Sequence, residues 1–413
     1  VINAEAKAYV DDIIDNEYWF NVGEYPEDFV PVLYNKDGTK AAGYVFKPDD
    51  DDNLHEVYFG YTRSGKTFAL TNRAIQKIEA EVADAVIILD QTGGSSVAEV
   101  DKHIGKELRM KYFTFWNVYE NGVPVNLLDC RGSLTYKEKK ERITRIYAMM
   151  TRSLGNYQEQ ILKNAVKSML YDMKKNPDIT IFDILQYIVQ YNEEGEPYLD
   201  EAHKKLRCKL QAVLDELEDT PQNKNSWGEF LKEQGKPIVV ISTGADSVGK
   251  GSEIIDIMLE SLYTYKQCHP CEKYSVIIDE AQDLYLHEKG TVNVLLRKGG
   301  KHNITMLLAS QSFPDPNIQF GKVVGNCGRL RSYHPKADDL KRAANYFSCD
   351  KDEVDFLKQG ECYDKGLFWS RYRFENVITT LKGKTVVFEP APDNDNNDDE
   401  QSCGCSEGGE HNG

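Results

Sequence analysis

The chain has 413 residues, of which 40% are hydrophobic and 28% are charged, a composition typical of a globular protein with a large buried core. No apolar run approaches the roughly 20 residues that a membrane-spanning helix needs, so we expect no membrane anchor within this sequence. The net charge of −17 excludes a generally basic outer surface for nucleic acid, although a local basic lining is compatible with it.

Nine cysteines are spread through the chain, and an odd number does not predict a disulfide framework in a protein of this size. We interpret them as reduced thiols and expect a cytoplasmic protein. Association with a membrane would then depend on a partner or on sequence upstream of Val1. Cys268 and Cys271 form one CxxC pair, but the second pair of a zinc site is missing, so an incidental loop pair is the preferred interpretation.

The first 55 residues predict a small β-rich lead-in, in which 30–34 and 42–46 flank a turn at 36–38 and indicate one hairpin. From Glu56 the pattern changes to short apolar runs between helical stretches, which is typical of parallel strands buried on both faces. The predicted strands are 56–59, 85–90, 111–116, 237–242, 274–279, 305–310, 329–334, 367–374 and 385–389. Together they predict an α/β fold with a mainly parallel central sheet.

Between about 136 and 235 the strand signal disappears and amphipathic helices are predicted instead. Apolar residues recur there at three- and four-residue steps: Ile143, Ile146 and Met150, then Leu162, Val166, Met169 and Met173, then Leu206, Leu210, Val213 and Leu217. We expect a helical insert, because the strands before and after it must share one sheet. The predicted domains are the lead-in (1–55), the first part of the core (56–135), the helical insert (136–235), the second part of the core (236–390) and a disordered acidic tail (391–413).

The strongest functional signal is GYTRSGKT at residues 60–67, a full GxxxxGK[ST] motif between a strand-like and a helix-like segment. Glycines allow the backbone to curl so that successive N–H groups point at phosphates, and the following helix presents its positive N-terminal end. Lys66 is expected to bridge the β- and γ-phosphate oxygens, and the Thr67 hydroxyl is expected to bind Mg²⁺. The predicted ATP-binding residues are Gly60, Thr62, Arg63, Ser64, Gly65, Lys66 and Thr67.

A phosphate loop of this kind predicts a second element, an apolar strand that ends in a carboxylate near the metal. Residues 274–280 supply it, with Asp279 as the expected metal ligand. Glu280, one residue further, is expected to act as the general base for the water that attacks the γ-phosphate. Without the phosphate loop, an acidic pair after a strand would be interpreted as a helix N-cap.

A third apolar strand, 305–310, is followed by Gln311. In open α/β sheets the ligand binds at the carboxyl ends of the strands, so Gln311 is predicted to sense the γ-phosphate or to position water. The alternative is an ordinary solvated strand end.

Taken together, these segments resemble the HerA/FtsK class of P-loop motors, which includes conjugative DNA-coupling proteins and viral packaging ATPases. The resemblance rests on the two motifs, on the acidic strand end at Asp90, on the NLLD-like element at 126–129 and on the segment from Leu295 to Gln311. It implies a RecA-like core that forms a hexameric ring, hydrolyses ATP with Mg²⁺ between subunits and drives DNA through the pore. It also implies a nuclease, conjugation, defence or capsid partner.

Two positions depart from the family pattern. Arg63 stands where the family commonly has Gly, although TRSGK is similar to the version in coupling proteins. Gly300 occupies the position of the Arg that many members supply to the neighbouring subunit. The candidates for that trans-acting cation are Lys301, Arg297, Arg329 and Arg331, of which we favour Arg329 and Arg331.

Two basic clusters are candidates for non-specific DNA contacts. The first comprises Lys137, Lys139, Lys140, Arg142 and Arg145, and the second Arg297, Lys298 and Lys301. We prefer the second because acidic residues interleave with the first. Two other functions share this core: a secretion or assembly ATPase that acts on protein, and a slow nucleotide switch that stabilises an assembly.

Overall fold

The computed structural model describes residues 54–355, apart from gaps at 80, 130–133, 152, 177, 219, 222, 245–250, 287–289, 314–318 and 348–349. It also describes the backbone of strand segments at 29–34, 40–42, 361–369, 372–380 and 385–390. The predicted acidic tail at 391–413 and most of the lead-in therefore lie outside the described residues.

Seven parallel strands form the centre of the main sheet in the described part of the chain. In spatial order they are β11 (Arg329–Tyr333), β3 (Glu56–Phe59), β10 (Ile304–Ser310), β9 (Tyr274–Ile278), β4 (Ala85–Asp90), β8 (Ile238–Ser242) and β5 (Phe113–Asn117). Beside β11, β12 (Glu361–Trp369) and β13 (Tyr372–Thr380) continue the sheet in antiparallel pairing. The prediction of a mainly parallel α/β sheet is confirmed.

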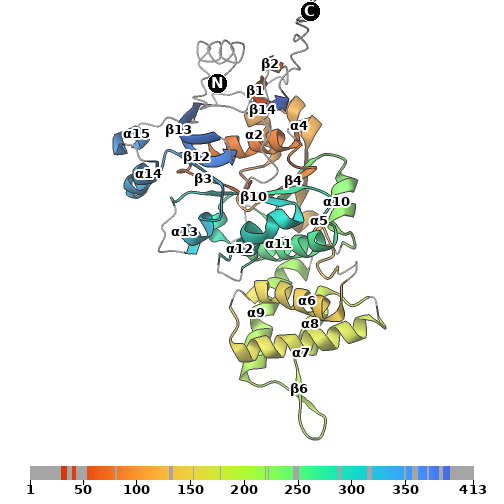
Figure 1. The fold of residues 1–413 in the computed structure, drawn as a ribbon. Coiled ribbons are helices and arrows are strands. Elements are labelled where there is room, and N and C mark those ends of the chain that lie inside the picture. The colour runs from red at the N-terminus through yellow and green to blue at the C-terminus, as the bar shows by residue number, and fades with distance from the viewer. Residues whose placement is uncertain are drawn as a thin grey trace, which may run out of the picture.

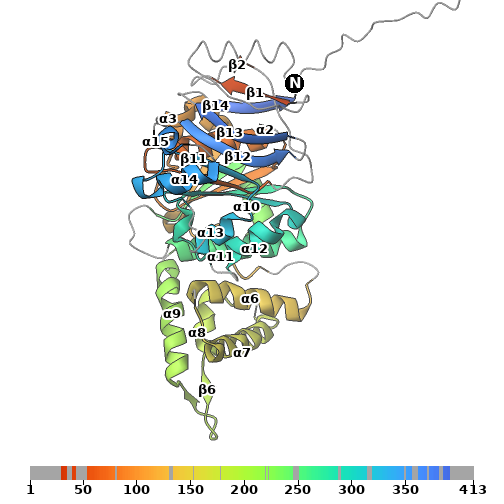
Figure 2. The ribbon, with the colours of Figure 1, turned by 60° about the vertical axis from the view of Figure 1, so that its left-hand side comes forward.

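Helices cover both faces of this sheet, which is why its strands are apolar on both sides. α2 (Lys66–Glu79), α3 (Val97–Ile104) and α4 (Lys106–Tyr112) pack on one face, in a cluster that includes Leu70 and Val86. α10 (Trp227–Gln234), α11 (Gly251–Cys268) and α12 (Thr291–Lys298) pack on the other, in a cluster that includes Ile87 and Val292. Figures 1 and 2 show the two helical layers with the sheet between them.

Helices of the insert form a separate layer on the far side of α11 (Figures 1 and 2). They are α6 (Tyr136–Thr151), α7 (Asn156–Met173), α8 (Ile184–Tyr187) and α9 (Glu201–Glu218), and the short strands β6 (Gln190–Tyr191) and β7 (Pro197–Tyr198) form a hairpin that projects from them. The residues that predicted the helices are buried, apart from Met173, which is half-buried. α6 docks on α11 through an ion pair from Arg145 to Glu260, with Nε and Oε1 2.9 Å apart.

The remaining described elements are short. They are α5 (Val118–Asn121), α13 (Gln319–Val324), α14 (Leu340–Phe347), α15 (Lys351–Asp355) and the 3-10 turns Ile181–Asp183, Ala281–Asp283, Gly299–His302 and Ala337–Asp339. Within the described part of the chain, none of the helices has the length and apolar character needed to cross a bilayer.

Four sequence predictions differ from the structure in detail. The predicted strand 367–374 is wrong, since it joins the end of β12 to the start of β13. The predicted strand 385–389 corresponds to β14 (Thr385–Pro390), but β14 pairs with β1 (Phe29–Tyr34), which pairs with β2 (Lys40–Ala42) as a predicted hairpin would. Residues 111–112 end α4 rather than begin β5. α10 falls within the predicted insert, yet it packs on α11, where Trp227 Nε1 donates to Ser261 Oγ at 3.2 Å.

Candidate nucleotide site

The loop at residues 60–67 joins β3 to α2 in the conformation that a phosphate loop requires. Gly60 has φ 155°, and a Cβ there would lie 2.7 Å from Tyr333 Cβ and 2.6 Å from Ser64 Oγ, so a side chain does not fit. Gly65 has φ 107° and Arg63 has φ 65°, a left-handed conformation that is uncommon outside glycine. The need for this conformation explains why a glycine suits position 63. Strain of this kind is concentrated at functional sites.

Lys66 lies at the first position of α2 with its ammonium folded over the loop. Its Nζ donates to the carbonyl oxygens of Gly60 at 2.7 Å and Tyr61 at 3.3 Å. Burial lowers the pKa of Lys66, and the carboxylates of Asp279 and Glu280 oppose that shift. The ammonium is therefore desolvated and surrounded by acceptors, which suits a group that must bind phosphate oxygens.

Thr67 meets the acidic strand end as the sequence predicts, because its Oγ1 donates to Asp279 Oδ2 at 3.2 Å. The two residues are 212 positions apart in the chain. Burial raises the pKa of Asp279 to about 6, Glu280 adds to the rise and Lys66 opposes it. A hydroxyl and a carboxylate at hydrogen-bonding distance are oxygen donors of the kind that Mg²⁺ prefers, so the residues present fit this ion.

Glu280 and Gln311 are also brought together, and the strand order explains how. β10 lies between β3 and β9, so the tip of β10 separates the phosphate loop from the acidic pair. Gln311 Nε2 donates to Glu280 Oε1 at 2.7 Å, and Gln311 Oε1 accepts from Thr62 Oγ1 at 3.2 Å. Glu280 is 9% exposed and has φ 56°. One side chain thus links the phosphate loop to the expected base.

A second loop closes the site at the end of β4. The carboxylate of Asp90 is buried and accepts three backbone N–H bonds, from Thr92 at 3.0 Å, Gly93 at 2.9 Å and Ser95 at 2.8 Å. A Cβ on the neighbouring Gly94 would lie 3.7 Å from Asp279 Oδ2. Asp90 therefore shapes the loop that packs against the metal-side carboxylate.

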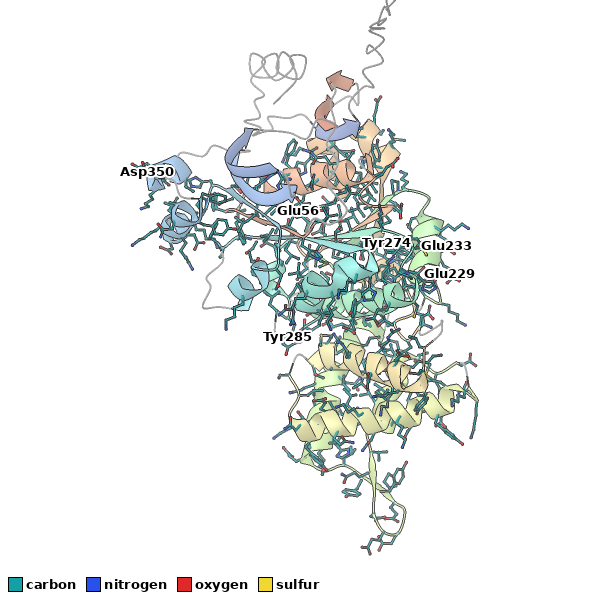
Figure 3. All side chains as sticks on the ribbon, in the orientation of Figure 1. Glu56, Glu229, Glu233, Tyr274, Tyr285 and Asp350 are labelled. Carbon is teal, nitrogen blue, oxygen red and sulfur yellow. The ribbon has the colours of Figure 1, made fainter. Side chains whose placement is uncertain are left out.

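Arg329 and Arg331 lie away from these strand tips, on β11 beside β3. Glu56 at the start of β3 is fully buried, accepts from Arg73 Nε at 3.0 Å and pairs with Lys77 at 3.0 Å. Burial alone would raise the pKa of Glu56, but the charges of Arg73, Lys77 and Arg329 hold it well below its usual range. Figure 3 labels Glu56 on the side of the sheet covered by α2.

Arg331 belongs to the same buried region, since its guanidinium lies 4.8 Å from the centre of the Tyr58 ring and its Nη1 donates to the Tyr333 hydroxyl at 3.5 Å. A cation that reaches into a neighbouring subunit is expected to be exposed. Arg331 is 9% exposed and Arg329 is half-buried, whereas Arg297 and Lys301 are exposed. The positions of the four candidates thus favour Arg297 or Lys301 over the two residues preferred from sequence.

The preferred DNA-contact residues Arg297, Lys298 and Lys301 are exposed at the end of α12 and in the following turn. They precede β10, so they lie at the opposite end of that strand from Gln311, about 20 Å away for a strand of this length. In the other cluster, Arg142 Nη1 donates to Thr264 O at 3.4 Å and Arg145 pairs with Glu260, so both arginines contact α11. Because these two arginines of the first cluster already contact α11, the structure agrees with the choice of the second cluster for DNA contacts.

Metal-binding clusters of three or more His, Cys, Asp and Glu residues are absent from the described residues, and Cys268 and Cys271 are free thiols. Two neighbours of the site were missed from sequence. Gln282 Nε2 donates to Glu280 Oε2 at 2.7 Å, and the charge of Lys336, after β11, contributes to the lowered pKa of Lys66. Only the strand order shows that β11 lies beside β3, and the sequence does not contain that order.

No protein-family model matches the sequence, and no curated protein matches it significantly. Solved structures do share its fold. VirB4 of Thermoanaerobacter pseudethanolicus aligns over 87% of this chain and 98% of its own, with a TM-score of 0.60 and 14% identity. The bacterial conjugative coupling protein TrwB aligns over 90% of this chain and 96% of its own, with a TM-score of 0.56 and 13% identity. TrwB bound to ADP and Mg²⁺ aligns with a TM-score of 0.54 and 14% identity, over 90% of this chain and 96% of its own. The chain therefore has the RecA-like P-loop fold that VirB4 and TrwB share, with a mainly parallel sheet between two helical layers.

Proposed function

We propose that the chain is an ATP-hydrolysing motor of the HerA/FtsK class that works as a hexameric ring and moves DNA. The observation that carries the ATPase assignment is the convergence of Thr67, Asp279 and Glu280, from segments more than 200 residues apart, beside a loop shaped for phosphates. Support comes from the fold it shares with TrwB, whose structures include complexes with ADP and Mg²⁺ and with a non-hydrolysable ATP analogue.

Each residue has a separate task in the proposed reaction. Lys66 and the loop amides bind the phosphate oxygens of ATP, where a desolvated ammonium interacts more strongly than in water. Glu280 accepts a proton from the water that attacks the γ-phosphate, and Gln311 lies between this base and Thr62. These residues come from three strand tips, so the site forms only when the sheet is assembled.

Thr67 and Asp279 are the residues that would hold Mg²⁺, because their oxygens are 3.2 Å apart. When bound, this ion neutralises phosphate charge. Asp279 must give up its proton for this task, and its raised pKa shows that the carboxylate is destabilised where it stands. A nearby cation would relieve that destabilisation.

A trans-acting cation completes the proposed site in a ring. We propose Arg297 or Lys301 for this role, because both are exposed whereas Arg331 is packed against Tyr58. Arg329 and Arg331 remain the competing candidates, since a trans role has no local signature in the chain. The setting that we propose is cytoplasmic, with any attachment to a membrane supplied by a partner or by sequence upstream of Val1.

DNA is the proposed cargo, on the strength of the exposed Arg297, Lys298 and Lys301 and the resemblance to coupling proteins. Protein is the competing cargo, and one observation favours it. The tip of the insert combines three exposed tyrosines, Tyr157, Tyr191 and Tyr198, with the acidic residues Glu193, Glu194 and Glu196. Such a surface repels phosphates and suits contact with another protein.

ATP turnover with and without DNA tests the proposal. The purified chain should form a multi-subunit particle by light scattering and hydrolyse ATP several-fold faster with duplex or single-stranded DNA. Lys298→Ala should need more DNA for the same stimulation, whereas Lys137→Ala, an exposed lysine on α6, is the matched control. Turnover that no DNA stimulates would favour the protein-directed motor, and binding of ATP without turnover would favour the nucleotide switch.

A further inference from the structure

Glu280 is held by two glutamine amides rather than one. Gln311 Nε2 donates to its Oε1 and Gln282 Nε2 to its Oε2, both at 2.7 Å. The opposite orientation of either amide would turn a carbonyl oxygen toward the carboxylate, which electrostatic repulsion disfavours. Each donor therefore binds one oxygen of the Glu280 carboxylate and restricts the rotation of that carboxylate.

The two amides differ in what they are attached to. Gln311 follows β10 and also accepts from Thr62, so its position depends on the phosphate loop. Gln282 belongs to the 3-10 turn Ala281–Asp283 directly after Glu280. Backbone bonds hold this turn, from Asp283 N to Glu280 O at 3.1 Å and from Leu284 N to Ala281 O at 3.3 Å. Gln282 is thus fixed relative to Glu280 whatever the phosphate loop does.

Gln282 also presents an acceptor beside the carboxylate. Its Oε1 is buried and has no hydrogen-bond partner among the described residues. A buried polar atom without a partner costs about 1 to 3 kcal/mol, so its presence next to the expected base needs a reason. The amide thus leaves its own oxygen unpaired while its Nε2 donates to Glu280, which indicates that this donation is what the side chain is placed for.

We infer that Gln282 is a positioning residue for hydrolysis, which holds the Glu280 carboxylate in the orientation in which it accepts a proton from the attacking water. Gln311 then has a different task, because it transmits the state of the phosphate loop to the same carboxylate. The inference rests on the proposed ATP hydrolysis and assigns a residue that the motif at 279–280 does not include. Glu280 also has a left-handed backbone, with φ 56°, directly before the turn that carries Gln282.

Two substitutions of Gln282 test this inference in the full chain. Gln282→Met keeps the length of the side chain and removes the amide, so kcat should fall about 10- to 100-fold while KM for ATP stays near that of the parent. Gln311→Met should change KM as well as kcat, because Gln311 also contacts Thr62. Gln211→Met, an exposed position on α9, is the matched control.

Gln282→Glu gives a second test, because the pH dependence of its turnover should change only if the side chain at position 282 acts on Glu280. At neutral pH its carboxylate repels Glu280, and turnover should be lower than in Gln282→Met. On acidification the carboxyl at position 282 becomes protonated and donates as the amide did, so turnover relative to the parent should rise. Binding of a fluorescent ATP analogue, unchanged in both variants, would show that they are folded.

The failures are distinguishable. A parent that binds but never hydrolyses ATP overturns the proposed function and this inference with it. A parent that hydrolyses ATP, with Gln282→Met at the same kcat and Gln282→Glu without recovery at low pH, overturns only the role of Gln282.

Discussion

The strand tips of the core and the helices of the insert are organised by different demands. At the tips, residues are kept in arrangements that oppose stability: the buried Asp279 has a raised pKa, and Arg63 and Glu280 have left-handed backbones. In the insert, periodic apolar residues such as Ile146, Leu162 and Leu210 are fully buried in an ordinary helical core. The residues at the strand tips of the core are therefore determined by the chemistry of the site, whereas those of the insert are determined by the packing of its helices.

The largest expected effect falls on the core tips. Glu280→Gln should keep ATP bound and reduce turnover by about 10²- to 10⁴-fold, the usual contribution of a general base. Lys66→Ala should abolish nucleotide binding, because Lys66 is the buried cation at the phosphate loop. Single-turnover hydrolysis and equilibrium binding of a labelled analogue measure the two losses separately. If Glu280→Gln hydrolysed ATP like the parent, the assignment of chemistry to these tips would be wrong.

The difference between the two regions also decides how much the sequence predicts. The phosphate loop, Asp279 and Glu280 are local patterns whose chemistry fixes both residue type and spacing, and the structure brings them together. The insert helices are predicted from the spacing of residues such as Val213 and Leu217. The contact of Arg331 with Tyr58 depends on the order of the strands, and the bond from Gln282 to Glu280 depends on the geometry of a turn. No local sequence pattern contains either.

Burial of the Asp279 carboxylate should lower the stability of the folded chain at neutral pH. Its pKa rises from 3.8 to about 6 in the folded chain, so the folded state binds the proton more tightly than the unfolded state. Stability must then fall as pH rises between about 4 and 6, by about 3 kcal/mol for a shift of about two units. Asp279→Asn removes this term and should stabilise the chain at pH 7 without Mg²⁺.

Denaturant midpoints of the parent and Asp279→Asn, measured in a chelator at pH 4 and pH 7, provide the check. The two proteins should differ little at pH 4, and the variant should be the more stable at pH 7. Adding Mg²⁺ together with a nucleotide should stabilise the parent more than the variant, because the variant keeps the phosphate loop but lacks the carboxylate that binds the ion. Equal stability of both proteins at pH 7 in the chelator would mean that burial does not destabilise the ionised form of Asp279.

The smallest loss of stability is expected at the contact between the insert and the core. A substitution there tests whether the packing of the insert can change without changing the chemistry of the site. Arg145 of α6 contacts Glu260 of α11, which is 2% exposed at its side chain and also accepts from Thr291 Oγ1 of α12 at 2.7 Å. Breaking a buried ion pair costs about 3 to 5 kcal/mol, but Arg145 is 37% exposed and Thr291 still donates, so Arg145→Ala should cost about 2 kcal/mol.

Hydrogen exchange resolved by peptide is the appropriate measurement, because a chain with a separate insert need not unfold in one step. Arg145→Ala should accelerate exchange in α6 and α11, whereas Lys137→Ala, on the same helix but exposed, should not. ATP affinity should be unchanged in both variants. The phosphate loop leads into α2 on one face of the sheet. The insert lies on the side of the other face, where Figure 3 labels Tyr285 between the core and the insert. Reduced turnover in Arg145→Ala would mean that α12, which leads through residues 299–303 to β10 and Gln311, connects the insert to the site, and that packing and chemistry are not separate in this chain.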